Sequence, residues 1–337
     1  MAAQFWKSLP NGHVQCRLCS QFCDIPPRER GFCGVRGNDG NGVAYSMVES
    51  GVAALNLDPV EKKPLYHYLP GTMTLSFGTP GCNFACPFCQ NAALAHEARD
   101  LGRVRLQNIT AQRLVAEAGR SGAASLSFTY NEPTVFFELM AETADLARQA
   151  GFGTILVSNG FQSPDSLEAL QGRIQAANID LKSFREAFYR EYCQARLAPV
   201  LDNLKTMRAS GWWLEVTTLL IPGRNDSSEE LRDLARFIVQ EMGPEVPWHI
   251  SRFRPAFRMQ DVPPTPLADL ERAARIGQEE GLRFVYLGNV IQDAFAATFC
   301  PSCERKLLSR LGFQITGPPF DGRCPCGERI PGIWSGA

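Results

Sequence analysis

The chain has 337 residues, of which 45% are hydrophobic and 20% are charged, so it can bury a large core and disorder is excluded. Thirty-four Lys and Arg against 35 Asp and Glu leave a net charge of -1, which gives no general attraction to nucleic acid or to an anionic membrane. No apolar run approaches the roughly 20 residues of a membrane span. The first residues lack the apolar core of a secretory signal. We therefore expect a soluble, cytoplasmic protein with no membrane partner.

Strand and helix patterns alternate along most of the chain. The first 45 residues are polar and rich in Gly and Pro, and alternation begins with a strand at 73–79. The pattern then predicts helices at 109–121, 134–150, 163–171, 199–210, 227–241 and 266–280, and strands at 124–129, 153–158, 177–181, 212–220, 248–253 and 284–286. Such alternation is typical of parallel βαβ units. We predict an α/β fold, a partial (β/α)6 barrel whose active site lies in the loops after the strands.

Twelve cysteines in a chain without an export signal favour metal ligands over disulfides. All but Cys193 fall into three groups, and Cys193 is interpreted as a small buried hydrophobic residue. The front group is Cys16, Cys19, Cys23 and Cys33; the core group is Cys82, Cys86 and Cys89; the rear group is Cys300, Cys303, Cys324 and Cys326.

The core group forms a C-x3-C-x2-C motif directly after a predicted strand. Three thiolates can bind three irons of a [4Fe–4S] cluster and leave the fourth iron open, whereas four cysteines would close the site. A structural zinc site with a distant fourth ligand is the alternative. The strand-then-loop context favours the cluster.

The sequence CNFACPFC at 82–89 resembles the C-x3-C-x-aromatic-C motif of radical S-adenosylmethionine (SAM) enzymes, with Phe88 as the aromatic residue. The resemblance implies a full or partial parallel barrel and catalytic cysteines that hold a [4Fe–4S] cluster. It also implies that the open iron binds SAM. The cluster then cleaves SAM to methionine and a 5′-deoxyadenosyl radical, which abstracts a hydrogen atom from a substrate.

The same resemblance implies contacts to SAM. Glu132 stands where these enzymes carry a Gly-Gly-Glu segment that meets the SAM amino group, although Tyr130 and Asn131 replace the glycines. Asp180-Leu181-Lys182 resembles the Asp-x-Lys of glycyl-radical-enzyme activases, whose lysine meets the SAM carboxylate, and His249 resembles their late histidine near the ribose. The cofactor-binding residues implied are Phe88, Thr129, Asn131, Glu132, Ser158, Asn159, Asp180, Lys182, Glu215 and His249.

The whole chain resembles a narrower group, the AmmeMemoRadiSam family, which is related to pyruvate formate-lyase activating enzymes. The supporting stretches are 14–19, 31–36, 58–67, 129–133, 179–183, 215–222 and 331–334. This resemblance implies Ammecr-type and Memo-type partners, together with an electron donor such as flavodoxin or ferredoxin. The substrate stays open between a protein glycine and a nucleobase, RNA or small metabolite. The alternative class is a non-enzymatic metal-binding interaction module.

The two end groups also have metal-ligand spacing. The front group, C-x2-C-x3-C-x9-C, predicts a closed site for zinc or an accessory Fe–S cluster. The rear group resembles a zinc ribbon whose second knuckle is one residue tighter than usual, and a site shared between the two ends is a third option. We expect a metal-binding segment at 1–45, the barrel at 65–295 and a zinc-ribbon-like segment at 296–337.

Overall fold

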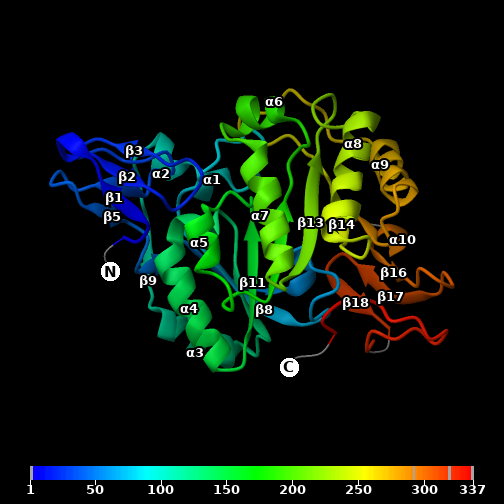
Figure 1. Cartoon of the computed structure of the whole chain (residues 1–337). Coiled ribbons are helices and arrows are strands. Elements are labelled where there is room, and N and C mark those ends of the chain that lie inside the picture. Colours follow the sequence, from blue (N-terminus) through cyan, green and yellow to red (C-terminus); the bar gives the residue numbers. More distant parts are fainter. Residues whose placement is uncertain (1–2, 291–292, 318–319, 335–337) are drawn as a thin grey trace.

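The computed structural model describes residues 3–290, 293–317 and 320–334. Its centre is an eight-stranded sheet with the order β15-β14-β13-β12-β11-β10-β8-β7 (Figure 1). The strands are β7 (Ala54–Pro59), β8 (Met73–Gly78), β10 (Ser125–Phe128), β11 (Gly153–Ser158), β12 (Ala176–Asp180), β13 (Trp213–Leu220), β14 (Trp248–Arg252) and β15 (Val285–Gly288). Every neighbouring pair is parallel except β7 with β8. In the described chain β7 and β15 do not pair, so the barrel is open.

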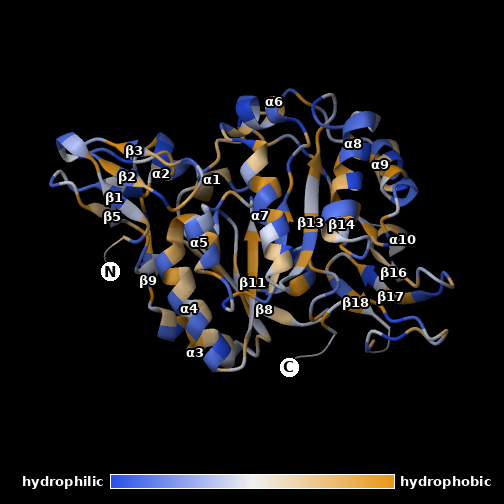
Figure 2. Ribbon diagram, in the orientation of Figure 1, coloured by the Kyte–Doolittle hydropathy of each residue, from blue (hydrophilic) through white to orange (hydrophobic). Residues whose placement is uncertain are grey.

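Helices cover the outer face of this sheet, one after each strand from β8 to β14 (Figure 1). They are α3 (Ala111–Ser121), α4 (Phe137–Gln149), α5 (Pro164–Glu168), α7 (Leu197–Ala209), α8 (Ser228–Phe237) and α9 (Leu267–Glu279). Their apolar sides turn toward the strands and their hydrophilic sides face outward (Figure 2). Six strand–helix units followed by β15 confirm the predicted partial barrel. No described helix is long and apolar enough to cross a membrane.

Side-chain caps explain where the predicted helices begin. Thr110, Ser163 and Ser227 each accept a hydrogen bond from a backbone N–H in the first turn of α3, α5 and α8. Such caps satisfy donors that have no partner within the helix. At the other end of α3, Gly122 adopts φ +70°, a left-handed conformation that glycine tolerates. The sequence signals at these positions therefore predict the helix starts to within two residues.

Short elements complete the fold. The remaining described α-helices are short: α1 (Ala92–Ala95), α2 (Glu97–Asp100), α6 (Glu186–Phe188) and α10 (Asp293–Ala296). There are 3-10 turns at Pro10–Gly12, Val60–Lys62 and Pro133–Phe136. Two π-helical turns lie at Tyr189–Cys193 and Ile238–Met242. The front segment contains β1 (Trp6–Ser8), β2 (Val14–Cys16), β3 (Asp24–Ile25) and β4 (Arg36–Asn38), and β5 (Ala44–Ser46) lies at its end. After it, β6 (Gly51–Val52) pairs with β9 (Gln107–Asn108). Strands of two or three residues are too short for periodicity to reveal.

A three-stranded antiparallel sheet follows the barrel at the rear. It consists of β16 (Thr298–Phe299), β17 (Lys306–Leu311) and β18 (Gln314–Thr316). Its apolar contacts with the barrel centre on Tyr66, Tyr286, Cys300 and Ile330. In Figure 1 this sheet lies below α10 and β14, at the opposite end of the molecule from the front segment.

Arg310 of β17 joins the rear sheet to the barrel. Its fully buried guanidinium donates to the backbone oxygens of Tyr66 and Ala296, at 2.7 and 3.0 Å, and lies 3.9 Å from the buried carboxylate of Glu61. It also stacks on the Tyr66 ring, 4.2 Å from the ring centroid. A buried carboxylate without its cation is costly, so this arginine fixes the position of the rear sheet.

We predict that Arg310→Met lowers the free energy of unfolding by about 3–5 kcal/mol, since it leaves Glu61 buried with its charge uncompensated. Denaturant titration measures the change. The matched control is Arg329→Met, at an exposed arginine of the same segment, for which we expect a change within about 0.5 kcal/mol. Equal stability of the two variants would show that Arg310 does not anchor the rear sheet.

Candidate active site

A cavity of about 650 Å³ opens at the carboxyl ends of the parallel strands. Its wall is built from the segments that follow β8, β10, β11, β12 and β14. Most of the residues that the sequence singles out line it: Cys82, Cys86, Phe88, Cys89, Thr129, Asn131, Glu132, Ser158, Asn159, Asp180, Lys182 and His249. Parallel strands end at one edge of a sheet, which is why residues far apart in sequence meet here. Glu215 is the exception.

The cysteine loop follows β8 and is held by Asn131. The Asn131 side chain accepts from the Thr79 N–H at 3.1 Å and donates to the Gly81 carbonyl at 2.7 Å. Gly81 adopts φ +98°, and a Cβ there would lie 2.9 Å from the carbonyl oxygen of Cys33. Only glycine therefore fits at the start of the loop. Asn131, implied to bind the cofactor, also shapes the loop that carries the cysteines.

The three core thiols are free and face one cavity. Burial raises the pKa of the Cys89 thiol to about 11 and that of Cys82 well above its ordinary value. Thiols in such surroundings stay neutral unless a cationic group stabilises their thiolates. Their sulfurs are not all within 4.8 Å of one another, so they suit a group larger than a single ion. Cluster irons, each bound to one thiolate, meet both conditions.

Cys193 touches the core group. It is fully buried in the π-helical turn Tyr189–Cys193, and its sulfur lies 3.7 Å from that of Cys86. Its carbonyl also accepts the Ala85 N–H at 2.9 Å. This contact raises the pKa of the Cys86 thiol. Burial agrees with the interpretation as a small hydrophobic residue, but nothing in the sequence spacing signals that it packs against the cysteine loop.

Glu132 follows β10 and is buried among protein donors. Its Oε1 accepts from the Thr134 hydroxyl at 2.6 Å and the Ser158 hydroxyl at 2.8 Å, and its Oε2 accepts from the Asn159 N–H at 2.8 Å. Burial raises the pKa of this carboxyl. A carboxylate has about four acceptor sites, and the Thr134 N–H also donates to Oε1. One site on Oε2 is therefore left for a donor in the cavity.

Lys182 and Asp180 form an ion pair at the end of β12. The Lys182 Nζ donates to the Asp180 carboxylate at 2.7 Å, and its side chain is 16% exposed. Burial lowers the pKa of Lys182, but the charge and hydrogen bond of Asp180, together with the nearby thiols of Cys86 and Cys193, outweigh burial, so the net pKa is raised. The lysine therefore stays cationic beside the core cysteines and has donors left for an anionic ligand.

His249 and Glu215 interact beneath the cavity. His249 lines the cavity, and its Nε2 lies 2.6 Å from the Glu215 carboxylate. Glu215 has no exposed surface and also accepts the backbone N–H groups of Tyr66 and His67 at 2.9 and 2.8 Å. Burial raises its pKa, yet the hydrogen bond and charge of His249, with smaller contributions from His67 and Trp213, lower the net value. Glu215 thus holds His249 in place rather than facing the cavity.

The sequence analysis does not predict two of the residues that line the cavity, Asn178 and Thr217. Asn178 Oδ1 and Thr217 Oγ1 are buried side-chain atoms on the cavity wall without a hydrogen-bond partner in the described chain. Buried polar atoms are normally paired, so both are positioned for a polar ligand. Asn178 lies two residues before Asp180, on the same face of β12, and this period of two could have signalled it.

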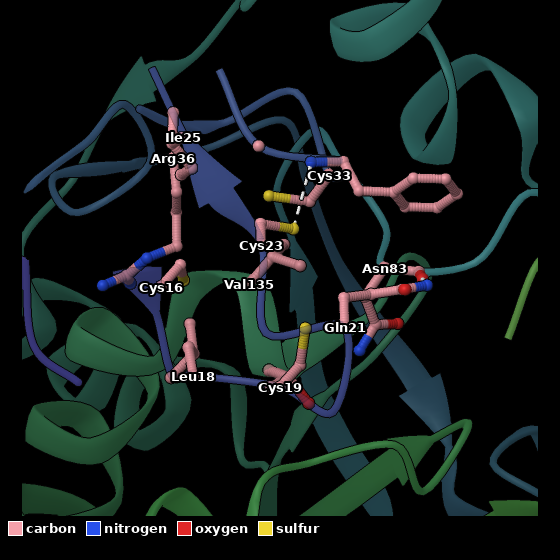
Figure 3. A pocket seen from close by; sticks show the side chains of 13 residues that line it. Cys16, Leu18, Cys19, Gln21, Cys23, Ile25, Cys33, Arg36, Asn83 and Val135 are labelled. Atoms are coloured by element: carbon pink, nitrogen blue, oxygen red, sulfur yellow. Dashed lines mark hydrogen bonds between the residues drawn. The ribbon is translucent and has the colours of Figure 1, made fainter. Parts of the chain in front are cut away.

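The structure keeps the two end groups apart. The rear sulfurs all lie within 4.8 Å of one another, with Cys300–Cys326 at 3.6 Å and Cys303–Cys324 at 3.5 Å. The front cysteines line a separate small space, whose lining includes none of the rear cysteines (Figure 3). A site shared between the two ends is therefore wrong.

Comparison with known proteins gives the family. Residues 77–238 match the model of the radical SAM superfamily. Over 332 residues the chain is 39% identical to MJ0808, an uncharacterized protein of Methanocaldococcus jannaschii, covering 97% of this chain and 98% of the relative. The chain belongs to the radical SAM superfamily. A radical SAM protein requires a [4Fe–4S] cluster and SAM, and the three free thiols fit that cluster.

Further likenesses agree with the radical SAM assignment. The isethionate sulfite-lyase activating enzyme of Oleidesulfovibrio alaskensis is 22% identical over 233 residues, which are 67% of this chain and 72% of the relative. A solved radical SAM methyltransferase from Sphaerobacter thermophilus matches with a TM-score of 0.51 at 15% identity, covering 65% of this chain and 67% of that chain. The latter likeness shows the fold alone.

We predict that Cys86→Ala loses the core cluster whereas Cys193→Ala, its buried neighbour, retains it. Removing one of three thiolates leaves the cluster with too few protein ligands, but Cys193 only packs against the loop. Iron and acid-labile sulfide analysis after anaerobic reconstitution measures the difference. Loss of the cluster from Cys193→Ala and its retention in Cys86→Ala would reverse the ligand assignment.

Proposed function

We propose that this chain is an enzyme that reductively cleaves SAM and uses the resulting 5′-deoxyadenosyl radical to abstract a hydrogen atom from a substrate. The observation that carries the proposal is one cavity that holds three free thiols together with a cationic lysine and a buried carboxylate. When bound by Cys82, Cys86 and Cys89, the cluster supplies the electron that cleaves SAM.

The charges around the cavity suit the two ends of the SAM amino-acid group. Lys182 offers ammonium donors to a carboxylate, and charge-assisted hydrogen bonds of this kind are stronger than neutral ones. The remaining acceptor site of Glu132 offers a carboxylate to an ammonium. His249, held by Glu215, would contact the ribose, as the family resemblance implies. Asp180 keeps Lys182 charged and oriented, which is a positioning role.

Two features bear on the substrate class, and they favour different candidates. Similarity to an isethionate sulfite-lyase activating enzyme supports a protein glycine as the hydrogen source. The unpaired Asn178 amide oxygen and Thr217 hydroxyl favour instead a polar small molecule or a nucleobase, whose edge could pair with them. The second candidate accords with the AmmeMemoRadiSam assignment and its Ammecr-type and Memo-type partners, with flavodoxin or ferredoxin as the electron donor.

The rear group suits zinc. Four sulfurs around a tetrahedral zinc, with Zn–S bonds of about 2.3 Å, stand about 3.8 Å apart. The sulfur pairs Cys300–Cys326, at 3.6 Å, and Cys303–Cys324, at 3.5 Å, are close to that spacing. The rear sheet and its cysteines would then form a zinc-stabilised segment that packs against β15.

The direct test is anaerobic incubation of cluster-loaded protein with SAM and a strong one-electron reductant. We expect 5′-deoxyadenosine and methionine to form. With a deuterated glycine-containing peptide, nucleoside or small metabolite, deuterium appears in 5′-deoxyadenosine only for the right substrate class. A fully loaded protein that forms no 5′-deoxyadenosine would favour the non-enzymatic metal-binding module.

We predict that Lys182→Ala weakens SAM binding about tenfold to a hundredfold, the loss of a charge-assisted hydrogen bond worth about 1.5–3 kcal/mol. Cluster absorbance stays unchanged because the lysine binds no iron. Equilibrium titration with SAM under anaerobic conditions measures the affinity. Glu132→Gln should weaken SAM binding in the same direction.

The matched control is Lys205→Ala, because Lys205 also pairs with an aspartate, Asp202 at 3.3 Å, but on an exposed face of α7. Its SAM affinity should equal that of the unaltered chain. If Lys182→Ala with a full cluster behaves like this control, Lys182 does not contact SAM.

A further inference from the structure

The front cysteines surround a small space of their own, separate from the large cavity (Figure 3). Cys16 ends β2, Cys19 and Cys23 lie in the connection to β3, and Cys33 precedes β4. All four line the space, together with the apolar side chains of Leu18, Ile25 and Val135. The fold thus brings four thiols from two chain segments around one enclosed point.

The spacing of these sulfurs differs from that of the rear group. No three of the front sulfurs lie within 4.8 Å of one another, whereas all four rear sulfurs do. A single tetrahedral ion needs sulfurs about 3.8 Å apart. In a [4Fe–4S] cluster each thiolate binds a different iron, so the sulfurs stand further apart. The front group shares its wider spacing with the core group Cys82, Cys86 and Cys89.

Arg36 lines the same space, and one of its guanidinium N–H donors, at Nε, has no hydrogen-bond partner in the described chain. The residue is 2% exposed, and its Nη1 donates to Glu138 at 2.8 Å. This Nε is also buried. An unpaired buried donor beside four thiols indicates that a negatively charged group belongs there. Four thiolates with an iron–sulfur cluster carry net negative charge and meet this need.

A backbone hydrogen bond to sulfur occurs in both places. The Phe32 N–H donates to the Cys23 sulfur at 3.5 Å, as Figure 3 shows, and the Phe84 N–H donates to the Cys82 sulfur at 3.4 Å. Hydrogen bonds to cysteine sulfurs are among the features that tune iron–sulfur clusters. The front site therefore resembles the core site in sulfur spacing and in this contact.

The front space and the large cavity share one thin wall. Cys82 and Phe84 line the cavity, while Asn83 between them lines the front space. The carbonyl of Asn83 accepts the side-chain amide of Gln21, between Cys19 and Cys23, at 2.9 Å. The contact between Cys33 and Gly81 places the Cα atoms of Cys33 and Cys82 within about 11 Å.

We propose that Cys16, Cys19, Cys23 and Cys33 bind a second [4Fe–4S] cluster, separated from the core site by the loop 82–84. The site is closed by four protein ligands, so unlike the core site it has no open iron for SAM. This proposal is independent of SAM cleavage, because it rests on other residues.

The test uses the full chain with Cys82, Cys86 and Cys89 all changed to Ala. After anaerobic reconstitution with iron and sulfide, this triple variant should retain about four irons and four sulfides. Adding Cys19→Ser should remove them. Adding Cys303→Ser instead, as the matched control in the rear group, should leave the iron count unchanged.

The metal content of the triple variant alone, without the Cys19→Ser substitution, already tests whether the front group binds a cluster. Zinc without iron, or no metal at the front group, would overturn the proposal. If the triple variant does not fold, the iron content of the unaltered chain decides: about eight irons support a second cluster, and about four contradict it. Failure of SAM cleavage in the unaltered chain would leave these counts unaffected.

Discussion

Burial of three thiols beside a carboxylate is the constraint on which the site depends. Burial raises the pKa values of Cys82 and Cys89 and of Glu132, so this edge of the sheet cannot hold their charges alone. In the proposed function, cationic iron would resolve the conflict for the thiolates, and the ammonium of SAM would resolve it for the carboxylate. The buried thiols and the buried carboxylate of Glu132 both require a positive partner, and the cavity that they line would therefore hold both the cluster and SAM.

Parallel pairing places the compensating groups. Asp180 pairs in register with Thr217, and Thr217 pairs with His249, so one line of residues runs across β12, β13 and β14 into the cavity. A shift of one residue in any strand would turn these side chains to the helix-covered face. The buried bond from His249 to Glu215 holds this arrangement from below. The architecture of the barrel therefore fixes the geometry of the site.

The sequence predicts the parts of this structure that have local signals. Strand and helix alternation predicts the barrel, and the spacing of the core cysteines predicts one loop with three thiols. The short strands of the front segment have too few residues for a pattern. The contact of Cys193 with Cys86 and the burial of Glu215 depend on tertiary packing. The linear sequence pattern carries no signal for either of them.

The residues assigned to SAM rest on resemblance together with the geometry of the cavity, and the front group rests on its cysteine spacing together with its geometry. The large cavity and the front space both lie against the same loop, residues 81–84. Side-chain amides hold this loop by hydrogen bonds to its carbonyls, from Asn131 to Gly81 and from Gln21 to Asn83. The front segment therefore does more than cover the barrel. It forms part of the wall that positions the core cysteines.

The central claim is that the core cysteines hold a cluster whose open iron binds SAM. Electron–nuclear double resonance on the reduced, cluster-loaded chain tests it, with SAM labelled with ¹⁵N at its amino group. We expect a nitrogen coupling that changes with the isotope and disappears in the Cys82/Cys86/Cys89→Ala variant. A fully reduced core cluster that shows no such coupling at saturating SAM would contradict the account.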